Sequence, residues 1–294
     1  MDDMGLLFCN FIAEKEACGL SKKTIENYKE SYFRYCKEIG LDISKDLIQK
    51  WVQLFLAKGM NHISINHYLN HLRVFVYWLM DNDYIERFEI KSLKNQEPQL
   101  KTFTDDELEL LLKKPSKECD FVTYRTWTII NFIMGTGARA STIINIKICD
   151  VHFVVKEIEY RHLKNKTVAV VPLSGALEII LKQYLNIWEI GNGYLFPDKY
   201  GNQLTTNALI HSIRSFCIRR GVKPRGAHSF RHTFAKKYII SGGNAFVLQR
   251  LLTHTDLSMT KKYVRLFNSD LQIGFNEVCP LDTFKKEHKI IKKR

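Results

Sequence analysis

The stretch HSFRHTFAKKYIISGG, residues 228–243, combines a helical pattern with side chains that can bind an anion and move a proton. His228 and Arg231 are three residues apart, so on a helix both project from one face. The stretch that follows, LLTHTDLSMTKKYVRL over residues 251–266, contains His254 and, nine residues later, Tyr263 among lysines. Each of these residues alone is typical of a protein surface, so a functional interpretation depends on their order and spacing.

Two more cationic positions lie upstream. Arg139 follows Gly135-Thr136-Gly137, where the glycines are expected to end one helix and open the next. Its guanidinium is therefore expected near the free N–H groups of a helix start, a natural site for a phosphate. Lys164 lies in a short turn between two expected strands, residues 157–162 and 167–173, and Lys166 lies in the same turn.

The charge of the chain is uneven. Its 294 residues include 44 basic and 31 acidic side chains, a formal net charge of +13. Residues 1–90 carry −2 and the remainder carries +15. Such an excess favours a polyanionic partner, most simply nucleic acid. A lysine-rich composition that only reflects an AT-rich genome and serves solubility is the alternative.

Several function classes lose support because their motifs are missing. The chain has no phosphate-binding G-x-x-x-x-G-K-[ST] loop, no G-x-G-x-x-G, no H-E-x-x-H and no G-x-S-x-G. Acidic residues of the second domain are scattered, so we expect no metal site and no cofactor. The cysteines form no C-x-x-C pair and their number is odd, which indicates a reduced, cytoplasmic compartment: Cys9, Cys18, Cys36, Cys119, Cys149, Cys217 and Cys279. No apolar run approaches the roughly 20 residues of a membrane span, and the acidic start MDDMGLLFCN predicts no export signal.

Residues 1–90 have the pattern of a small helical bundle. Three helices are expected to begin at capping serines: Ser21, Ser44 and Ser64. Glycines are expected to separate the segments: Gly19, Gly40 and Gly59. Residues 91–103 lose periodicity and contain Pro98, which predicts a linker.

A second domain is expected over residues 104–280. Thr104 and Glu107 have the spacing of a capping box at the start of its first helix. Residues 281–294 form a basic tail. The sequence therefore predicts a mainly α-helical protein with a small antiparallel β-sheet in its C-terminal domain.

These stretches together resemble the tyrosine recombinase, or phage integrase, family. GTGARASTIINI is similar to the family's first-arginine motif and LKNKTVAVVPL to its lysine-bearing hairpin. HSFRHTFAKKYIISGG matches the H-x-x-R box, and LLTHTDLSMTKKYVRL matches the segment from the last histidine to the nucleophile. The resemblance implies these catalytic residues: Arg139, Lys164, His228, Arg231, His254 and the nucleophile Tyr263. It covers nearly all of residues 104–280, and the first ninety residues are similar to the family's helical, SAM-like core-binding domain.

Three positions depart from the family's pattern. Thr142 stands where the family usually has an acidic residue that supports the first arginine. Thr253 stands where the family often has glycine before the last histidine. Lys166 competes with Lys164 for the role of the lysine.

The resemblance implies a reaction that needs neither ATP nor Mg²⁺. Tyr263 would attack a DNA phosphate to give a 3′-phosphotyrosine and a free 5′-hydroxyl, with His228 as general base and His254 hydrogen-bonded to a phosphate oxygen. Arg139 and Arg231 would neutralise charge on the phosphorus, and Lys164 would protonate the leaving oxygen.

The implied partner is a double-stranded DNA recombination site, bound by a homotetramer or by a heterotetramer with a related recombinase. An accessory directionality factor is a further partner. The absence of a separate arm-binding domain favours an Xer-like or transposon-borne member, and integration, excision, dimer resolution and inversion all stay open. Two other functions compete, a DNA-binding relative that no longer cleaves and a type IB topoisomerase.

Overall fold

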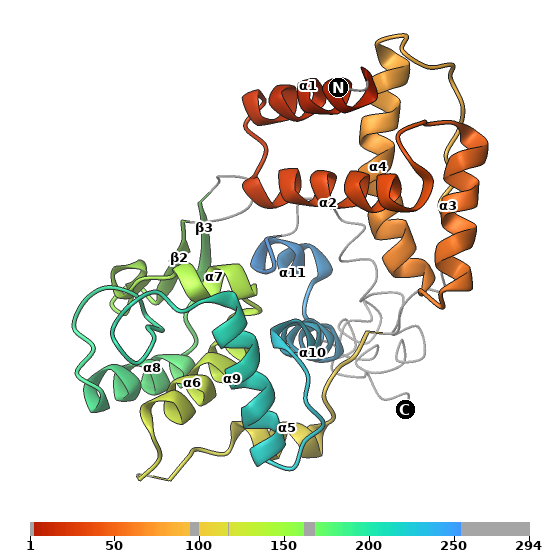
Figure 1. The fold of residues 1–294 in the computed structure, drawn as a ribbon. Coiled ribbons are helices and arrows are strands. Elements are labelled where there is room, and N and C mark those ends of the chain that lie inside the picture. Colours follow the sequence, from red (N-terminus) through yellow and green to blue (C-terminus); the bar gives the residue numbers. More distant parts are fainter. Residues whose placement is uncertain (1–2, 95–99, 117, 162–167, 254–294) are drawn as a thin grey trace, which may run out of the picture. The chain divides into compact units, whose positions relative to one another are not determined.

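The computed structural model describes residues 3–94, 100–116, 118–161 and 168–253. The chain divides into two compact units, Met1–Gln99 and Leu100–Arg294 (Figure 1). The division falls inside the segment 91–103 that was expected to be a linker. Each unit has a hydrophobic core of its own.

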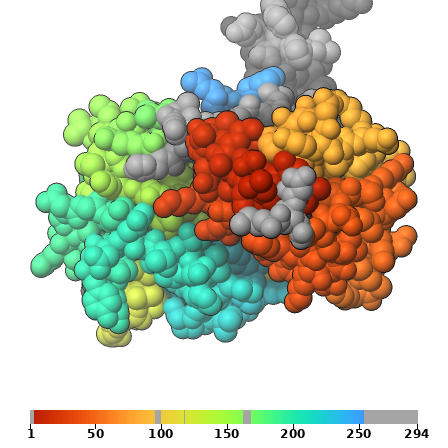
Figure 2. Space-filling view, turned by 45° about the horizontal axis from the view of Figure 1, so that its top comes forward, coloured from red at the N-terminus to blue at the C-terminus, as the bar shows by residue number. Residues whose placement is uncertain are grey.

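The N-terminal unit contains four helices in its described part. They are α1 (Asp3–Ala17), α2 (Lys22–Ile39), α3 (Lys45–Ala57) and α4 (His62–Asp81). Their outer surfaces are visible in Figure 2, from α1 and α2 in red to α3 and α4 in orange. Aromatic side chains fill the core between them, among them Phe11, Tyr35, Trp51 and Phe75, all at most 1% exposed.

Polar side chains fix where these helices begin. Ser21 accepts a hydrogen bond from the N–H of Thr24 at the start of α2, and Ser44 caps α3 in the same way, so both predicted starts are confirmed. The predicted start at Ser64 is wrong. Asn61 caps α4 instead, and its side chain accepts from the N–H of Ser64.

The C-terminal unit is built around one buried helix. After α5 (Asp105–Leu112), whose predicted capping box between Thr104 and Glu107 is confirmed, the chain enters α6 (Phe121–Thr136). Buried residues surround α6 on every side, as expected for a helix enclosed by others. It packs against α5, α8, α9 and α10. The remaining helices of the unit's described part are α7 (Ala140–Asn145), η1 (Ile148–Asp150), α8 (Gly175–Ile187), α9 (Thr206–Arg219), α10 (Ala227–Ile240) and α11 (Ala245–Leu251).

A small antiparallel sheet lies beside these helices. Its strands are β1 (Val151–His152), β2 (Glu157–Tyr160) and β3 (Ala169–Pro172), in the order β1-β2-β3. In the β2–β3 pair Glu157 lies opposite Pro172 and Tyr160 lies opposite Ala169. The described strands are shorter than the predicted segments 157–162 and 167–173, and β1 was not predicted. The predicted fold class, mainly helical with a small antiparallel sheet, is confirmed.

Candidate active site

Arg231 is the most deeply buried of the predicted site residues that the structure describes. It lies in α10 with only 4% of its surface exposed. Its guanidinium donates to the carbonyl oxygen of Gly137 at 2.6 Å and to that of Leu252 at 2.7 Å. A charged group is stable at such depth only when its N–H groups are hydrogen-bonded. Arg231 therefore connects the turn after α6 to the end of α11.

Arg139 lies immediately before α7 and is half-buried. The sequence predicted its guanidinium near the N–H groups at a helix start, but its side chain makes no hydrogen bond that caps α7. It donates instead to Thr253. Nη1 and Nη2 each lie 3.2 Å from the Thr253 carbonyl oxygen, and Nη1 also donates to the Thr253 hydroxyl. The two arginines thus bind the consecutive carbonyls of Leu252 and Thr253.

These carbonyls follow the last turn of α11. The end of a helix presents carbonyl oxygens without partners inside the helix, and it carries the negative end of the helix dipole. Guanidinium groups are the natural partners for such oxygens. The end of α11 therefore gathers two positive charges that lie 92 residues apart in the sequence, at positions 139 and 231.

Gly137 allows the turn between α6 and α7, which positions Arg139. Its φ of 68° is in the left-handed region, which favours glycine. A Cβ at this position would lie 2.6 Å from Leu252 Cδ2 and 2.6 Å from the ring of Phe234. The turn between α6 and α7 therefore packs directly on side chains of α10 and of the α11 end, and this packing brings Arg139 beside the residues that bind Arg231.

His228 lies one helical turn before Arg231 in α10 and is exposed at the surface. Partial desolvation, together with the positive charges of Arg231 and Arg139, lowers the pKa of its imidazole below the ordinary 6.5. A histidine with a lowered pKa is neutral at pH 7 and can accept a proton. Of the predicted residues, the structure thus brings together Arg139, His228 and Arg231.

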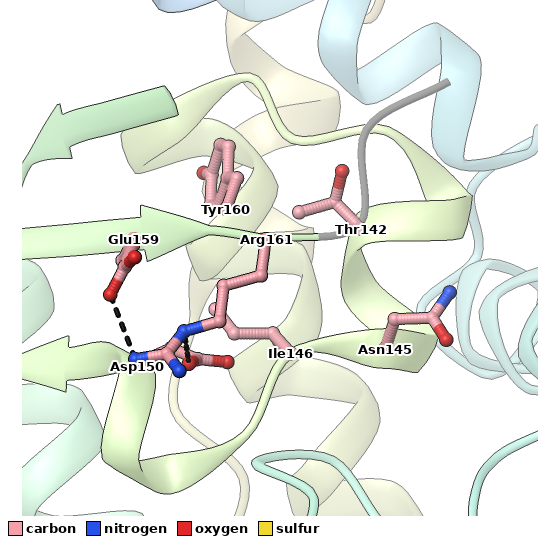
Figure 3. Close-up of a pocket in the computed structure, with 7 residues that line it drawn as sticks. All are labelled: Thr142, Asn145, Ile146, Asp150, Glu159, Tyr160 and Arg161. Atoms are coloured by element: carbon pink, nitrogen blue, oxygen red, sulfur yellow. Dashed lines mark hydrogen bonds and ion pairs between the residues drawn. The ribbon is translucent and has the colours of Figure 1, made fainter. Parts of the chain in front are cut away.

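An ion cluster joins the end of β2 to η1 (Figure 3). Arg161 donates to Asp150 at 2.8 Å and to Glu159 at 2.9 Å. Asp150 is buried, and its second oxygen accepts from the N–H of Lys147 at 2.8 Å. Beside the cluster is a cavity of about 10 Å³, also lined by Thr142, with room for about one water molecule.

Tyr160 lies at the end of β2, and the positive charge of Arg231 acts on the pKa of its hydroxyl. Its side chain is fully buried, and this burial raises the pKa of its hydroxyl well above the ordinary 10. A hydroxyl that stays protonated and cannot reach a large substrate is unsuited to attack a phosphate. Tyr160 is therefore a core residue of the sheet rather than a candidate nucleophile.

The other predicted residues lie outside the described part of the chain. Lys164 and its alternative Lys166 belong to residues 162–167, and His254 and Tyr263 belong to residues 254–294. The described structure reaches both segments. β2 and β3 flank residues 162–167, and Thr253 immediately precedes His254.

Two of these contacts were not predicted from the sequence. Thr253 was noted only as a departure from the family's glycine, and the pairing of Arg161 with buried Asp150 was not foreseen. Both depend on contacts between residues that only the fold brings together. Within the described ranges, no group of three or more His, Cys, Asp or Glu side chains could hold a metal ion. None of the helices described there is long and apolar enough to cross a membrane.

Comparison with known proteins identifies the family. The model of the phage integrase family matches residues 101–269, more than half of the chain. Tyrosine recombinase XerD of Staphylococcus haemolyticus is 24% identical over 279 residues, covering 89% of this chain and 94% of that protein. Tyrosine recombinase XerA of Pyrococcus furiosus is 26% identical over 259 residues, covering 87% and 88%.

Solved structures share the fold. The XerH site-specific recombinase bound to its palindromic difH substrate superposes with a TM-score of 0.73 at 21% identity, covering 89% of this chain and 82% of that one. The Tn1549 transposon integrase in complex with transposon right end DNA gives 0.71 at 17% identity, covering 90% and 98%. With the family model matching the segment that contains both arginines and the H-x-x-R box, the chain belongs to the phage integrase family of tyrosine recombinases.

Proposed function

We propose that this protein is a site-specific DNA recombinase whose nucleophile is Tyr263. The observation that supports it most is the pairing of Arg139 and Arg231 on consecutive carbonyls at the end of α11, beside His228 with its lowered pKa. Two guanidinium groups close together can bind the two non-bridging oxygens of one phosphate. The relatives named above are recombinases and integrases, which favours strand exchange between sites over relaxation of supercoils.

The proposed reaction is a pair of transesterifications. The hydroxyl oxygen of Tyr263 attacks the scissile phosphorus, the bond to the 5′-oxygen breaks, and a 3′-phosphotyrosine and a 5′-hydroxyl result. His228 takes the tyrosine proton, and Lys164, or Lys166 in the same turn, gives a proton to the leaving oxygen. The 5′-hydroxyl of another strand then attacks the phosphotyrosine and releases Tyr263. The number of phosphoester bonds is conserved in each step, so the proposed reaction consumes no ATP.

Positive charge in the transition state comes from side chains in this proposal. Arg139 and Arg231 neutralise the charge that gathers on the pentacoordinate phosphorus, and His254 donates a hydrogen bond to a phosphate oxygen. Removing one such donor typically costs about 3–4 kcal/mol of transition-state stabilisation. Because two guanidinium groups and a lysine would supply this positive charge, the proposed reaction needs no metal ion.

We assign residues 1–90 as the core-binding domain, 91–103 as the linker and 104–280 as the catalytic domain. The basic tail 281–294 is proposed to contact a neighbouring copy in a tetramer on DNA, formed with identical subunits or with a related recombinase. An accessory directionality factor is part of the proposal only for integration and excision. A protein that acts on cellular DNA in this way would work in the cytoplasm.

The test selects the DNA site in the same experiment that traps the covalent complex. Full-length protein is incubated with a library of nicked duplexes with random sequence around the nick, so that the cleaved end diffuses away and the covalent complex is trapped. We expect the wild-type protein to form complexes that survive SDS and Tyr263→Phe to form none. The trapped DNA, once sequenced, supplies the site for later assays. Equal amounts of complex from both proteins would refute Tyr263 as the nucleophile.

A further inference from the structure

Thr253 has a backbone conformation that is unfavourable for its type. α11 ends at Leu251, Leu252 follows it, and Thr253 then takes a φ of +50°, in the left-handed region. Its N–H donates to the carbonyl of Arg250 at 2.9 Å, which closes the helix end. Glycine is the usual residue at such a position, because a β-branched side chain is strained there. Threonine at this position is therefore unfavourable for the backbone alone.

Thr253 binds Arg139 through both its backbone and its side chain. The Thr253 carbonyl accepts from both Nη atoms of Arg139 at 3.2 Å, and the Thr253 hydroxyl accepts from Nη1. Any residue would supply the carbonyl, but the hydroxyl is specific to this side chain. Two acceptors from one residue fix the plane of a guanidinium as well as its distance, because the N–H groups of arginine form a rigid fork.

The contact between Arg139 and Thr253 also joins two segments of the site that are distant in the sequence. Arg139 precedes α7, whereas Thr253 follows α11 and immediately precedes His254 in the sequence. Leu252, the neighbour of Thr253, accepts from Arg231. A displaced Thr253 side chain would therefore change where Arg139 lies relative to Arg231 and His228, while leaving the hydrogen bonds of Arg231 in place.

We propose that the Thr253 hydroxyl positions Arg139 for the reaction, so that Thr253 is a positioning residue of this active site. The proposal rests on the proposed function for its effect on rate. Its structural content, that the hydroxyl holds the Arg139 guanidinium near His228, can be measured without any DNA. The competing explanation is that Thr253 only ends α11, in which case its hydroxyl is dispensable.

Three variants separate these explanations. Thr253→Val keeps the shape and the β-branch but removes the hydroxyl. Thr253→Ser keeps the hydroxyl and serves as the conservative control. Thr253→Gly removes the hydroxyl and also the backbone strain, so it is expected to raise the melting temperature while keeping only the carbonyl contacts with Arg139.

The first measurement is the titration of His228 by NMR in the full-length protein, with Arg139→Met as the reference. Within the described ranges, the charged or titratable groups recorded as acting on this ring are Arg139, Arg231 and His232. Removing Arg139 should raise the His228 pKa, because one of the positive charges that lower it is gone. Thr253→Val should raise it in the same direction, and Thr253→Ser should leave it at the wild-type value. A Thr253→Val titration equal to wild type, next to a shifted Arg139→Met, overturns the proposal.

The second measurement is the rate of covalent complex formation on the duplex selected by the wild-type protein. We expect Thr253→Val and Thr253→Gly to slow it by about tenfold or more at unchanged DNA affinity, the factor typical of a lost hydrogen bond to a charged group. Thr253→Ser should stay within about threefold of wild type. Equal slowing in the serine and valine variants overturns the role of the hydroxyl. Complex formation by Tyr263→Phe would instead refute the proposed function, and the His228 titration would still decide the role of Thr253.

Discussion

Replacing Arg231 with methionine should cost far more folding stability than the same change at Arg139. Arg231 is buried and donates to the carbonyls of Gly137 and Leu252, both themselves buried. Methionine fills similar space but leaves both carbonyls without a partner. Each stranded buried acceptor costs about 1–3 kcal/mol, so the expected loss is about 2–6 kcal/mol. That is a large share of the roughly 5–15 kcal/mol that stabilises a typical domain.

Arg139→Met is the matched control. Arg139 and its partner Thr253 are both partly exposed, so water can replace the lost N–H donors. Its expected cost is below about 1 kcal/mol, as for other partly exposed interactions. Urea denaturation of the two full-length variants gives the comparison. At about 2–4 °C per kcal/mol for a unit of this size, the melting temperature of Arg231→Met should also fall by roughly 4 °C or more.

Equal stability of the two variants would refute the reasoning. It would mean that the carbonyls of Gly137 and Leu252 find other donors and that Arg231 does not hold the two segments together. The result also matters for activity assays. Loss of cleavage in an Arg231 variant reports on chemistry only after its folded fraction has been measured. Loss of cleavage in an Arg139 variant reports on chemistry without that correction, because the variant is expected to stay folded.

Three other predictions follow from the site. Because the pKa of His228 is lowered, the folded state binds fewer protons than the unfolded state just below pH 6.5, and the free energy of unfolding falls there with decreasing pH. His228→Asn should remove this part of the pH dependence, measured as urea midpoints between about pH 5.5 and pH 7.5. Gly137→Ala should lose about 2 kcal/mol or more, because its Cβ would lie 2.6 Å from Leu252 and from Phe234 at a left-handed φ; a wild-type melting temperature would contradict this. Asp150→Ala should lose about 1 kcal/mol, because its buried carboxylate accepts from the N–H of Lys147 and pairs with Arg161; a wild-type urea midpoint would contradict this.

Local chemistry made much of the fold predictable from the sequence. Ser21, Ser44 and Thr104 begin helices because their side-chain oxygens accept from the N–H three residues ahead, and this requires no tertiary information. The error at Ser64 has a local cause as well. Asn61 lies three residues earlier and caps equally well, so α4 begins at His62 and Ser64 becomes the residue whose N–H is capped.

The candidate site was predictable only as a set of residues. His228 and Arg231 share α10, and their spacing alone indicated a common face. The hydrogen-bond partners of the arginines could not be predicted from the sequence. Arg139 and Thr253 are 114 residues apart, and their contact depends on how the turn at Gly137 packs against the end of α11. The sequence showed Thr142 and Thr253 as two separate departures. The structure shows that Thr142 lines a small cavity and that Thr253 binds Arg139.

The most direct test of the central claim is to locate the DNA adduct on the protein. The trapped complex, formed in EDTA and without ATP, is digested with a protease that cleaves before aspartate, and the nucleotide-bearing peptide is sequenced by mass spectrometry. We expect the adduct on the peptide of residues 256–269, in which Tyr263 is the sole tyrosine. An adduct on any other residue, or a complex that forms only with added Mg²⁺ or ATP, would contradict a metal-independent attack by Tyr263.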